Sequence, residues 1–204
     1  MQSKLLIQFL LFLLPLSLSG QSLELMVGNQ RVFADVQWLK PFDKEFRWTL
    51  FSRTRGTVDY KNNTDLFSGA YLNYTTKSGL GVSLVGRIGA TGTGSDIGIH
   101  LFKANDTWTL FALASISLQK ELQYSWFSIL RFTPELNENW RFYSSLELFS
   151  IFNKAGHAFS VQRLRAGVSW GEYTFGLANN LSEIGPDFGM PDNNFGVFWR
   201  KSFN

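Results

Sequence analysis

The sequence predicts an all-β fold, an antiparallel up-and-down transmembrane β-barrel of about 12 strands. The first observation is an alternation of apolar and other residues with a period of two along most of the chain, which is typical of strands that separate two environments. The second is that tryptophan, phenylalanine and tyrosine repeatedly stand near the ends of the alternating segments. The third is that no apolar run beyond the first 20 residues approaches the roughly 20 residues that a membrane helix requires.

The first 20 residues have the layout of a secretory signal peptide. Lys4 supplies a positive start, residues 5–18 are mainly apolar, and small residues follow at Ser17, Ser19 and Gly20. This order predicts cleavage after Ser19 or Gly20. The apolar run is shorter than a membrane span, so an uncleaved anchor is the less favoured reading.

The remaining residues, 21–204, are expected to form a single domain, since no linker, charge run or low-complexity segment divides them. The whole chain has 19 Lys and Arg residues and 16 Asp and Glu residues, and loss of Lys4 leaves 18 against 16. This balance argues against a nucleic-acid partner. The chain has no cysteine, which excludes a disulfide scaffold and a lipid-modified cysteine.

Eleven alternating segments are clear, and a shorter one precedes them. The predicted strands cover 31–39, 46–54, 69–76, 80–89, 97–103, 108–118, 124–132, 140–150, 159–169, 173–181 and 194–203, with 22–27 as the additional segment.

The connections alternate between short and long, which is typical of tight turns on one side of an outer membrane and longer loops on the other. The shorter group is 40–45, 77–79, 104–107, 134–139 and 171–172, and the longer group is 56–68, 90–96, 119–123, 153–158 and 182–193. The last strand ends on the short-turn side. If the N-terminus lies on the same side, the number of strands must be even, so segment 22–27 is needed and 12 strands are favoured over 10.

The alternation also assigns two faces. One face is apolar and includes Leu84 and Leu110, whereas the other includes His100 and many charged groups. Aromatic residues gather beside the short connections: Trp38, Phe46, Trp108, Phe132, Trp140, Trp170 and Tyr173. Aromatic rings prefer the boundary between membrane and water, so the apolar face is expected to face lipid. A secreted soluble β-barrel or sandwich with the apolar face inward, binding an apolar ligand, is the alternative.

On these features the chain resembles bacterial outer-membrane β-barrel proteins of porin-like type. The most local mark of the resemblance is the C-terminal amphipathic strand 194–204, in which Phe203 is the penultimate residue. The resemblance implies residence in the cell outer membrane, contact with its lipid, and recognition of the last strand by the outer-membrane assembly machinery. No specific family is indicated.

The predicted inward face carries the charges that bear on function. The candidate lumen-facing binding residues are Arg47, Arg53, Arg87, Arg131, Arg141, Glu147, Arg163 and Arg165. These seven arginines are opposed by Asp35, Glu45 and Glu147, which leaves a net charge of about +4 if all of them face inward. A positive lumen would favour small anionic solutes, so the sequence predicts a small channel with an anion preference. Arginine–carboxylate pairs could instead close the lumen and leave a structural or surface barrel.

Catalysis and cofactor binding are not predicted. The two histidines, His100 and His157, stand in no recognisable nucleophile motif, although Ser160 is close to His157 in sequence. Some outer-membrane barrels use serine and histidine for acyl transfer, and this remains the rival class of function. We expect no metal site and no cofactor.

Overall fold

The computed structural model describes residues 20–89 and 92–203. The predicted signal peptide therefore lies almost wholly outside the described residues. Among the described residues, no helix is long and apolar enough to cross a membrane.

Twelve strands form the described part of the chain. They are β1 (Gln21–Gly28), β2 (Arg31–Pro41), β3 (Trp48–Asp59), β4 (Thr64–Thr75), β5 (Leu80–Gly89), β6 (Gly92–Ala104), β7 (Trp108–Ser117), β8 (Tyr124–Phe132), β9 (Trp140–Asn153), β10 (Gly156–Trp170), β11 (Tyr173–Ile184) and β12 (Asp192–Phe203).

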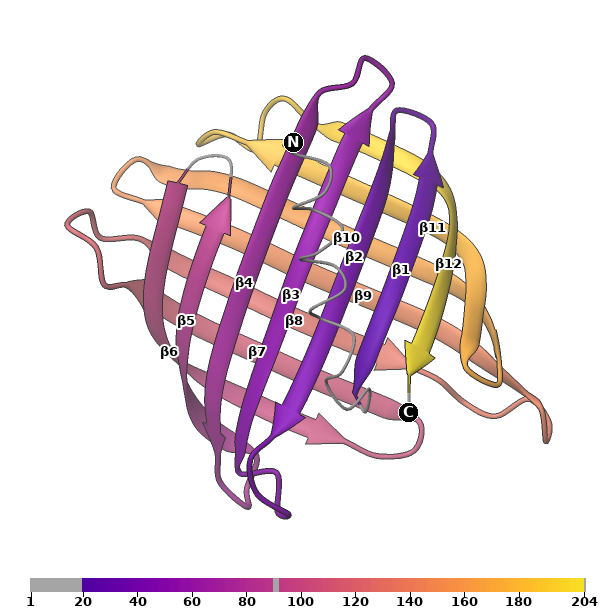
Figure 1. The fold of residues 1–204 in the computed structure, drawn as a ribbon. Helices are drawn as coiled ribbons and strands as arrows, with labels where there is room; N and C mark the ends of the chain where they lie inside the picture. Colours follow the sequence, from indigo (N-terminus) through magenta and orange to yellow (C-terminus); the bar gives the residue numbers. More distant parts are fainter. Residues whose placement is uncertain (1–19, 90–91, 204) are drawn as a thin grey trace, which may run out of the picture.

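Each strand pairs antiparallel with its neighbours in sequence, and β1 pairs with β12 to close the barrel. The closing pair runs from Gln21 opposite Phe203 to Gly28 opposite Gly196. In Figure 1, β1 to β6 form the front wall and cross the strands of the back wall at a large angle, with the start of β1 and the end of β12 at the lower end. We call this lower end the terminal end. Closure leaves the sheet without an edge, as a membrane barrel requires.

The strand count follows the sequence prediction, and the alternative of ten strands is wrong. The predicted contrast between short and long connections is also wrong. Segment 56–68 was expected to be a long loop, but β3 continues to Asp59 and β4 begins at Thr64. Likewise β6 begins at Gly92, and β11 continues to Ile184. The strands extend because glycine, serine and threonine, which resemble loop composition, pair in the ladder beyond the apolar belt.

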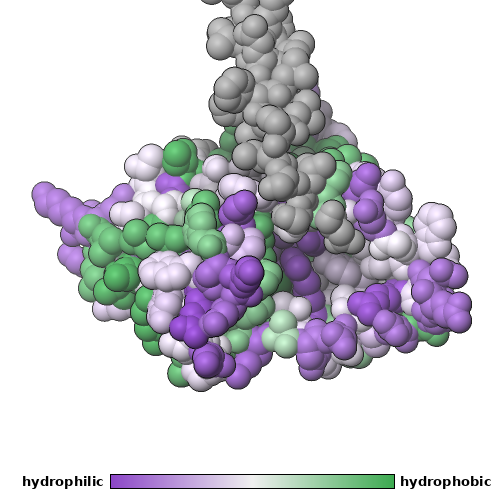
Figure 2. Space-filling view, turned by 60° about the horizontal axis from the view of Figure 1, so that its bottom comes forward, coloured by the Kyte–Doolittle hydropathy of each residue, from purple (hydrophilic) through white to green (hydrophobic). Residues whose placement is uncertain are grey.

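The barrel exterior is apolar, as predicted. Leu84, Ile99 and Leu177 have exposed fractions of 48%, 70% and 54%. Figure 2 shows hydrophobic residues on the flank of the barrel and hydrophilic residues along its rim. Aromatic residues cluster toward the terminal end in contacts such as Trp108 with Phe132 and Trp140 with Trp170. An apolar belt bounded by aromatic rings is suited to lipid and would be unstable in water, so the soluble alternative does not fit.

The barrel interior contains a packed core that the sequence analysis did not assign. Tyr71, Val85, Leu113 and Phe127 form one buried cluster, and Tyr71 lies 5.6 Å from Phe127 between ring centroids. A second buried cluster is Met26, Phe33, Tyr143, Ala178 and Phe198. Because β4 and β8 belong to different walls, the two walls touch through their side chains. The lumen is therefore partly filled.

Candidate functional site

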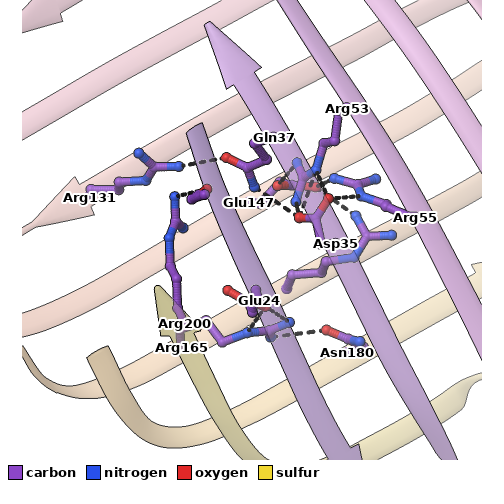
Figure 3. A network of polar contacts seen from close by, with 12 residues as sticks. Glu24, Asp35, Gln37, Arg53, Arg55, Arg131, Glu147, Arg165, Asn180 and Arg200 are labelled. Carbon is purple, nitrogen blue, oxygen red and sulfur yellow. Dashed lines mark hydrogen bonds and ion pairs between the residues drawn. The ribbon is translucent and has the colours of Figure 1, made fainter. Parts of the chain in front are cut away.

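The middle of the lumen holds a compact group of buried charges, which we call the central cluster: Asp35, Arg53, Arg55, Glu147 and Arg163. Arg53 donates through Nε to Asp35 Oδ1 at 2.8 Å and also binds Glu147 through Nη1. Arg55 donates to Glu147 as well, and Arg163 Nη1 lies 2.6 Å from Glu147 Oε1. Figure 3 shows the carboxylates of Asp35 and Glu147 beside the guanidinium groups of Arg53 and Arg55. Each carboxylate thus forms ion pairs with more than one arginine.

The central cluster spans the lumen from wall to wall. Arg53 lies on β3 and Glu147 on β9, which are six strands apart in the ring of 12 and so lie opposite each other. Arg53 and Glu147 have exposed fractions of 5% and 6%. Arginine suits this position because its planar fork binds two carboxylates at once. Charged groups so far from water are stable only when they are paired and hydrogen-bonded.

Two further ion pairs line the lumen wall. Arg165 Nε donates to Glu24 Oε1 at 2.9 Å, and its Nη1 donates to Asn180 Oδ1 at 3.0 Å (Figure 3). Arg87 pairs with Asp96, near the end of the barrel opposite the terminal end. These contacts are local, since they join strands at most three places apart in the ring.

Two of the candidate residues lie at the terminal rim. Arg47 precedes β3 in the β2–β3 turn and lies 2.5 Å from Glu45. Arg141 is the second residue of β9 and pairs with Glu135, and its side chain is 43% exposed. Both lie beside solvent and pair with a carboxylate, and Arg141 also lines a second cavity together with Arg131 and Arg200.

The terminal end of the lumen opens into a cavity of about 390 Å³, which we call the vestibule. Arg131 on β8 and Arg200 on β12 both line it. Arg131 Nη2 donates to Gln37 Oε1 at 3.3 Å, whereas its Nε has no partner among the described residues. Arg200 donates to Tyr143 Oη at 3.2 Å and to Ser22 Oγ at 2.8 Å. Neither arginine forms an ion pair with a carboxylate of the described residues.

The inner lumen has an excess of positive charge. Between the rims, the described residues place seven guanidinium groups and four carboxylates inward, which leaves a net charge of +3. The arginines are Arg53, Arg55, Arg87, Arg131, Arg163, Arg165 and Arg200, and the carboxylates are Glu24, Asp35, Asp96 and Glu147. Because the other five arginines share the four carboxylates, two of the three excess charges are those of Arg131 and Arg200.

Four of these charges were absent from the predicted inward face. Arg55 and Asp96 stand just beyond predicted strand ends, and Glu24 lies in the short first segment. Arg200 lies within a predicted strand, beside the outward-facing Lys201. Strict alternation from Phe198 would have placed Arg200 inward, so a signal was present for that residue.

Both histidines bind serine inside the barrel. His157 Nε2 lies 2.6 Å from Ser160 Oγ and its Nδ1 lies 2.6 Å from the Gly185 carbonyl oxygen, while Phe188 stacks on the ring at 3.9 Å. His100 Nδ1 lies 2.7 Å from Ser83 Oγ. His157 and Ser160 are each 4% exposed, so this pair is sealed under Phe188. Within residues 20–89 and 92–203, no group of three histidine or acidic residues is placed to hold a metal ion.

Comparison with known proteins gives structural neighbours only. No family model matches the chain, and no curated protein matches its sequence. The NanC porin is similar over 91% of this chain and 100% of its own length, with a TM-score of 0.57 and 10% identity. The KdgM porin is similar over 90% of this chain and 99% of its own, with a TM-score of 0.54 and 8% identity. LpxR from Salmonella typhimurium is similar over 89% and 100%, with a TM-score of 0.51 and 9% identity.

These likenesses concern the fold, which is the narrow 12-stranded barrel described above. The lipid-suited exterior independently places the barrel in a membrane. The chain therefore forms a 12-stranded membrane β-barrel whose fold is similar to that of the NanC and KdgM porins.

Proposed function

We propose that this barrel is a narrow channel through which small anionic solutes cross the outer membrane. The observation that carries the proposal is the concentration of the positive excess at Arg131 and Arg200, which face the vestibule. A barrel that served only as scaffold would gain nothing from arginines without carboxylate partners, because such charges are costly to remove from water. A positive lumen attracts anions and repels cations. The KdgM porin, whose structure has been solved in complex with oligogalacturonate, offers a parallel for an anionic solute in such a barrel.

The central cluster supplies the constriction of the proposed channel. It joins β3 to β9 across the lumen, with apolar clusters packed on the same inner face. Ions would have to pass beside these groups, so the wild-type conductance should be low. The vestibule would then select the ion, and the central cluster would limit its flow.

Selectivity is tested by the reversal potential of single channels in a planar bilayer with a KCl gradient. We expect the wild-type value to lie toward the chloride equilibrium potential. The double variant Arg131→Glu with Arg200→Glu changes the inner charge from +3 to −1, so its reversal potential should change sign. Arg47→Glu, at the rim, is the control. An unchanged potential in the double variant would refute the selective role of these arginines.

The constriction is tested separately with all five residues of the central cluster replaced by serine. This variant removes three positive and two negative charges, so the net charge of the inner lumen falls only from +3 to +2 while the side chains become shorter. Replacing whole ion-pair groups is generally better tolerated than removing one partner. Conductance should rise without a change in the sign of selectivity. A heat-modifiability gel of the outer-membrane fraction would verify that the barrel has folded.

A closed barrel with a structural or surface role is the second candidate. The contact of Tyr71 with Phe127 and the central cluster favour it, because both reduce the open section of the lumen. If neither the wild type nor the combined serine variant conducts, this second candidate replaces the channel.

A further inference from the structure

Part of the vestibule wall is apolar, in contrast to its two arginines. Phe51, Phe111, Phe127 and Ile129, from β3, β7 and β8, line the cavity. Phe111 lies 6.0 Å from Phe127 and Phe51 lies 5.6 Å from Tyr71, between ring centroids. Phe127 belongs to the buried cluster that also holds Val85 and Leu113, and Phe51 and Phe111 pack against that cluster, so these rings form a preorganised apolar surface.

The arginines lie beside this apolar wall. Arg131 is two residues from Ile129 on β8, and side chains at this spacing point to the same face of a strand. A guanidinium group has five N–H donors, of which Arg131 uses one and Arg200 two in contacts with described residues. The vestibule therefore combines free donors for an anion with an aromatic wall.

The vestibule is accessible from the terminal end. Its lining includes Gln21 and Phe203, at the outer ends of β1 and β12. The space-filling surface is hollowed inside the hydrophilic rim (Figure 2). A volume of about 390 Å³ lies in the range of small-molecule sites, which are mainly apolar with a few polar groups that fix orientation.

We propose that the vestibule binds a small organic anion with an apolar body, such as an aryl carboxylate, with its carboxylate on Arg131 and Arg200 and its ring against Phe111, Phe127 and Ile129. This inference rests on the proposed function and narrows its solute class. A strongly hydrated anion, such as a sugar acid, would leave the aromatic wall without a matching partner. A neutral aromatic molecule would leave both guanidinium groups unused.

Binding of three matched compounds tests the inference by titration calorimetry of the detergent-solubilised barrel, with detergent alone as the blank. Phenylacetate has both features, acetate has the charge alone, and phenylacetamide has the ring alone. We expect phenylacetate to bind saturably and at least roughly tenfold more tightly than the other two, the ratio that an added charged hydrogen bond or a buried ring supplies.

Variants then assign each part of the site. Arg131→Gln should weaken phenylacetate by roughly tenfold, and Ile129→Thr should weaken it less while leaving acetate unchanged. Arg47→Gln removes a positive charge at the same end, outside the vestibule lining, and should have no effect. Arg131→Gln removes a cation without a carboxylate partner, so the fold should be retained, which the heat-modifiability gel verifies.

Equal binding of acetate and phenylacetate would overturn the role of the aromatic wall, and equal binding of phenylacetamide would overturn the role of the arginines. Absence of any binding by folded protein would overturn the inference altogether. None of these outcomes affects the reversal potential, so an anion-selective channel that fails to bind phenylacetate would leave the proposed function standing.

Discussion

The central cluster and the vestibule use the same residue, arginine, in opposite electrostatic settings. In the central cluster, Glu147 accepts from Arg53, Arg55 and Arg163, and the group joins opposite walls. In the vestibule, Arg131 and Arg200 bind only neutral oxygens of described residues. The arginines of the central cluster join opposite walls, whereas Arg131 and Arg200 have no carboxylate partner among the described residues and would bind the solute in the proposed function. The number of lumen arginines therefore says little about selectivity until their partners are known.

The largest expected effect breaks the central cluster. Glu147→Gln leaves three buried guanidinium groups with Asp35 as the remaining carboxylate, and removal of one partner from a buried ion pair costs about 3–5 kcal/mol. Urea unfolding of the barrel from lipid vesicles measures this loss. Arg131→Gln, in the vestibule, should cost less than about 1 kcal/mol, because no carboxylate loses a partner. Similar losses in both variants would remove the distinction between the two regions.

A charge on the outer wall should have the next largest effect. Leu84 is 48% exposed near the middle of β5 and has no carboxylate beside it in the ladder. Leu84→Arg should cost about 2–4 kcal/mol if the side chain faces the bilayer midplane. Ile88→Arg, closer to the end of the strand, should cost about 0–1 kcal/mol under the same unfolding conditions if it lies near the interface. Equal losses of stability in the two variants would show that Leu84 does not lie closer to the bilayer midplane than Ile88.

A smaller effect is expected when Arg131 in the vestibule is given a carboxylate partner. Thr109 is the cross-strand neighbour of Arg131 and lines the same cavity, so Thr109→Asp supplies the missing carboxylate. A cross-strand opposite-charge pair adds only about 0.2–1 kcal/mol of stability, but the reversal potential should move toward zero and phenylacetate binding should weaken. Thr109→Asn, which adds no charge, should leave the reversal potential unchanged. An unchanged reversal potential in Thr109→Asp would argue against selection at Arg131.

The smallest expected effect concerns a turn at the terminal end. Asp43 accepts hydrogen bonds from the backbone N–H groups of Trp48, Arg47 and Glu45, and these bonds lower the pKa of Asp43 below its usual value. Because the pKa of Asp43 is lower in the folded state, ionised Asp43 stabilises the turn at pH values above the ordinary aspartate pKa of about 3.9. This contribution to stability is lost as the pH falls through the lower pKa of the folded state. Unfolding of Asp43→Asn and wild type should therefore differ at pH 7 and converge in acid. A difference that does not shrink as the pH is lowered would contradict this account.

The sequence was sufficient to predict the wall of the barrel. Alternation separated Leu84 from its inward neighbour Ser83, and the requirement for an even number of strands added segment 22–27, which is β1. This requirement gave the correct number of strands although the expected long loops were wrong. It depended only on both chain ends lying at the same end of the barrel.

The arrangement of charges could not be predicted in the same way. Glu147 meets Arg53 only because 12 strands close and bring β9 opposite β3, and no spacing in the sequence encodes that meeting. The inward aromatic residues were missed for a related reason. Tyr71 and Phe127 fall on the inner face by alternation, but aromatic residues at strand ends were associated with the lipid boundary. Contact between the walls makes an apolar ring stable inside the barrel.

The link between β3 and β9 also has a mechanical consequence. Strand number alone sets only an approximate barrel diameter, and a ring of strands can be round or oval at the same circumference. A brace of oppositely charged side chains between β3 and β9 therefore limits the distance between these two facing walls.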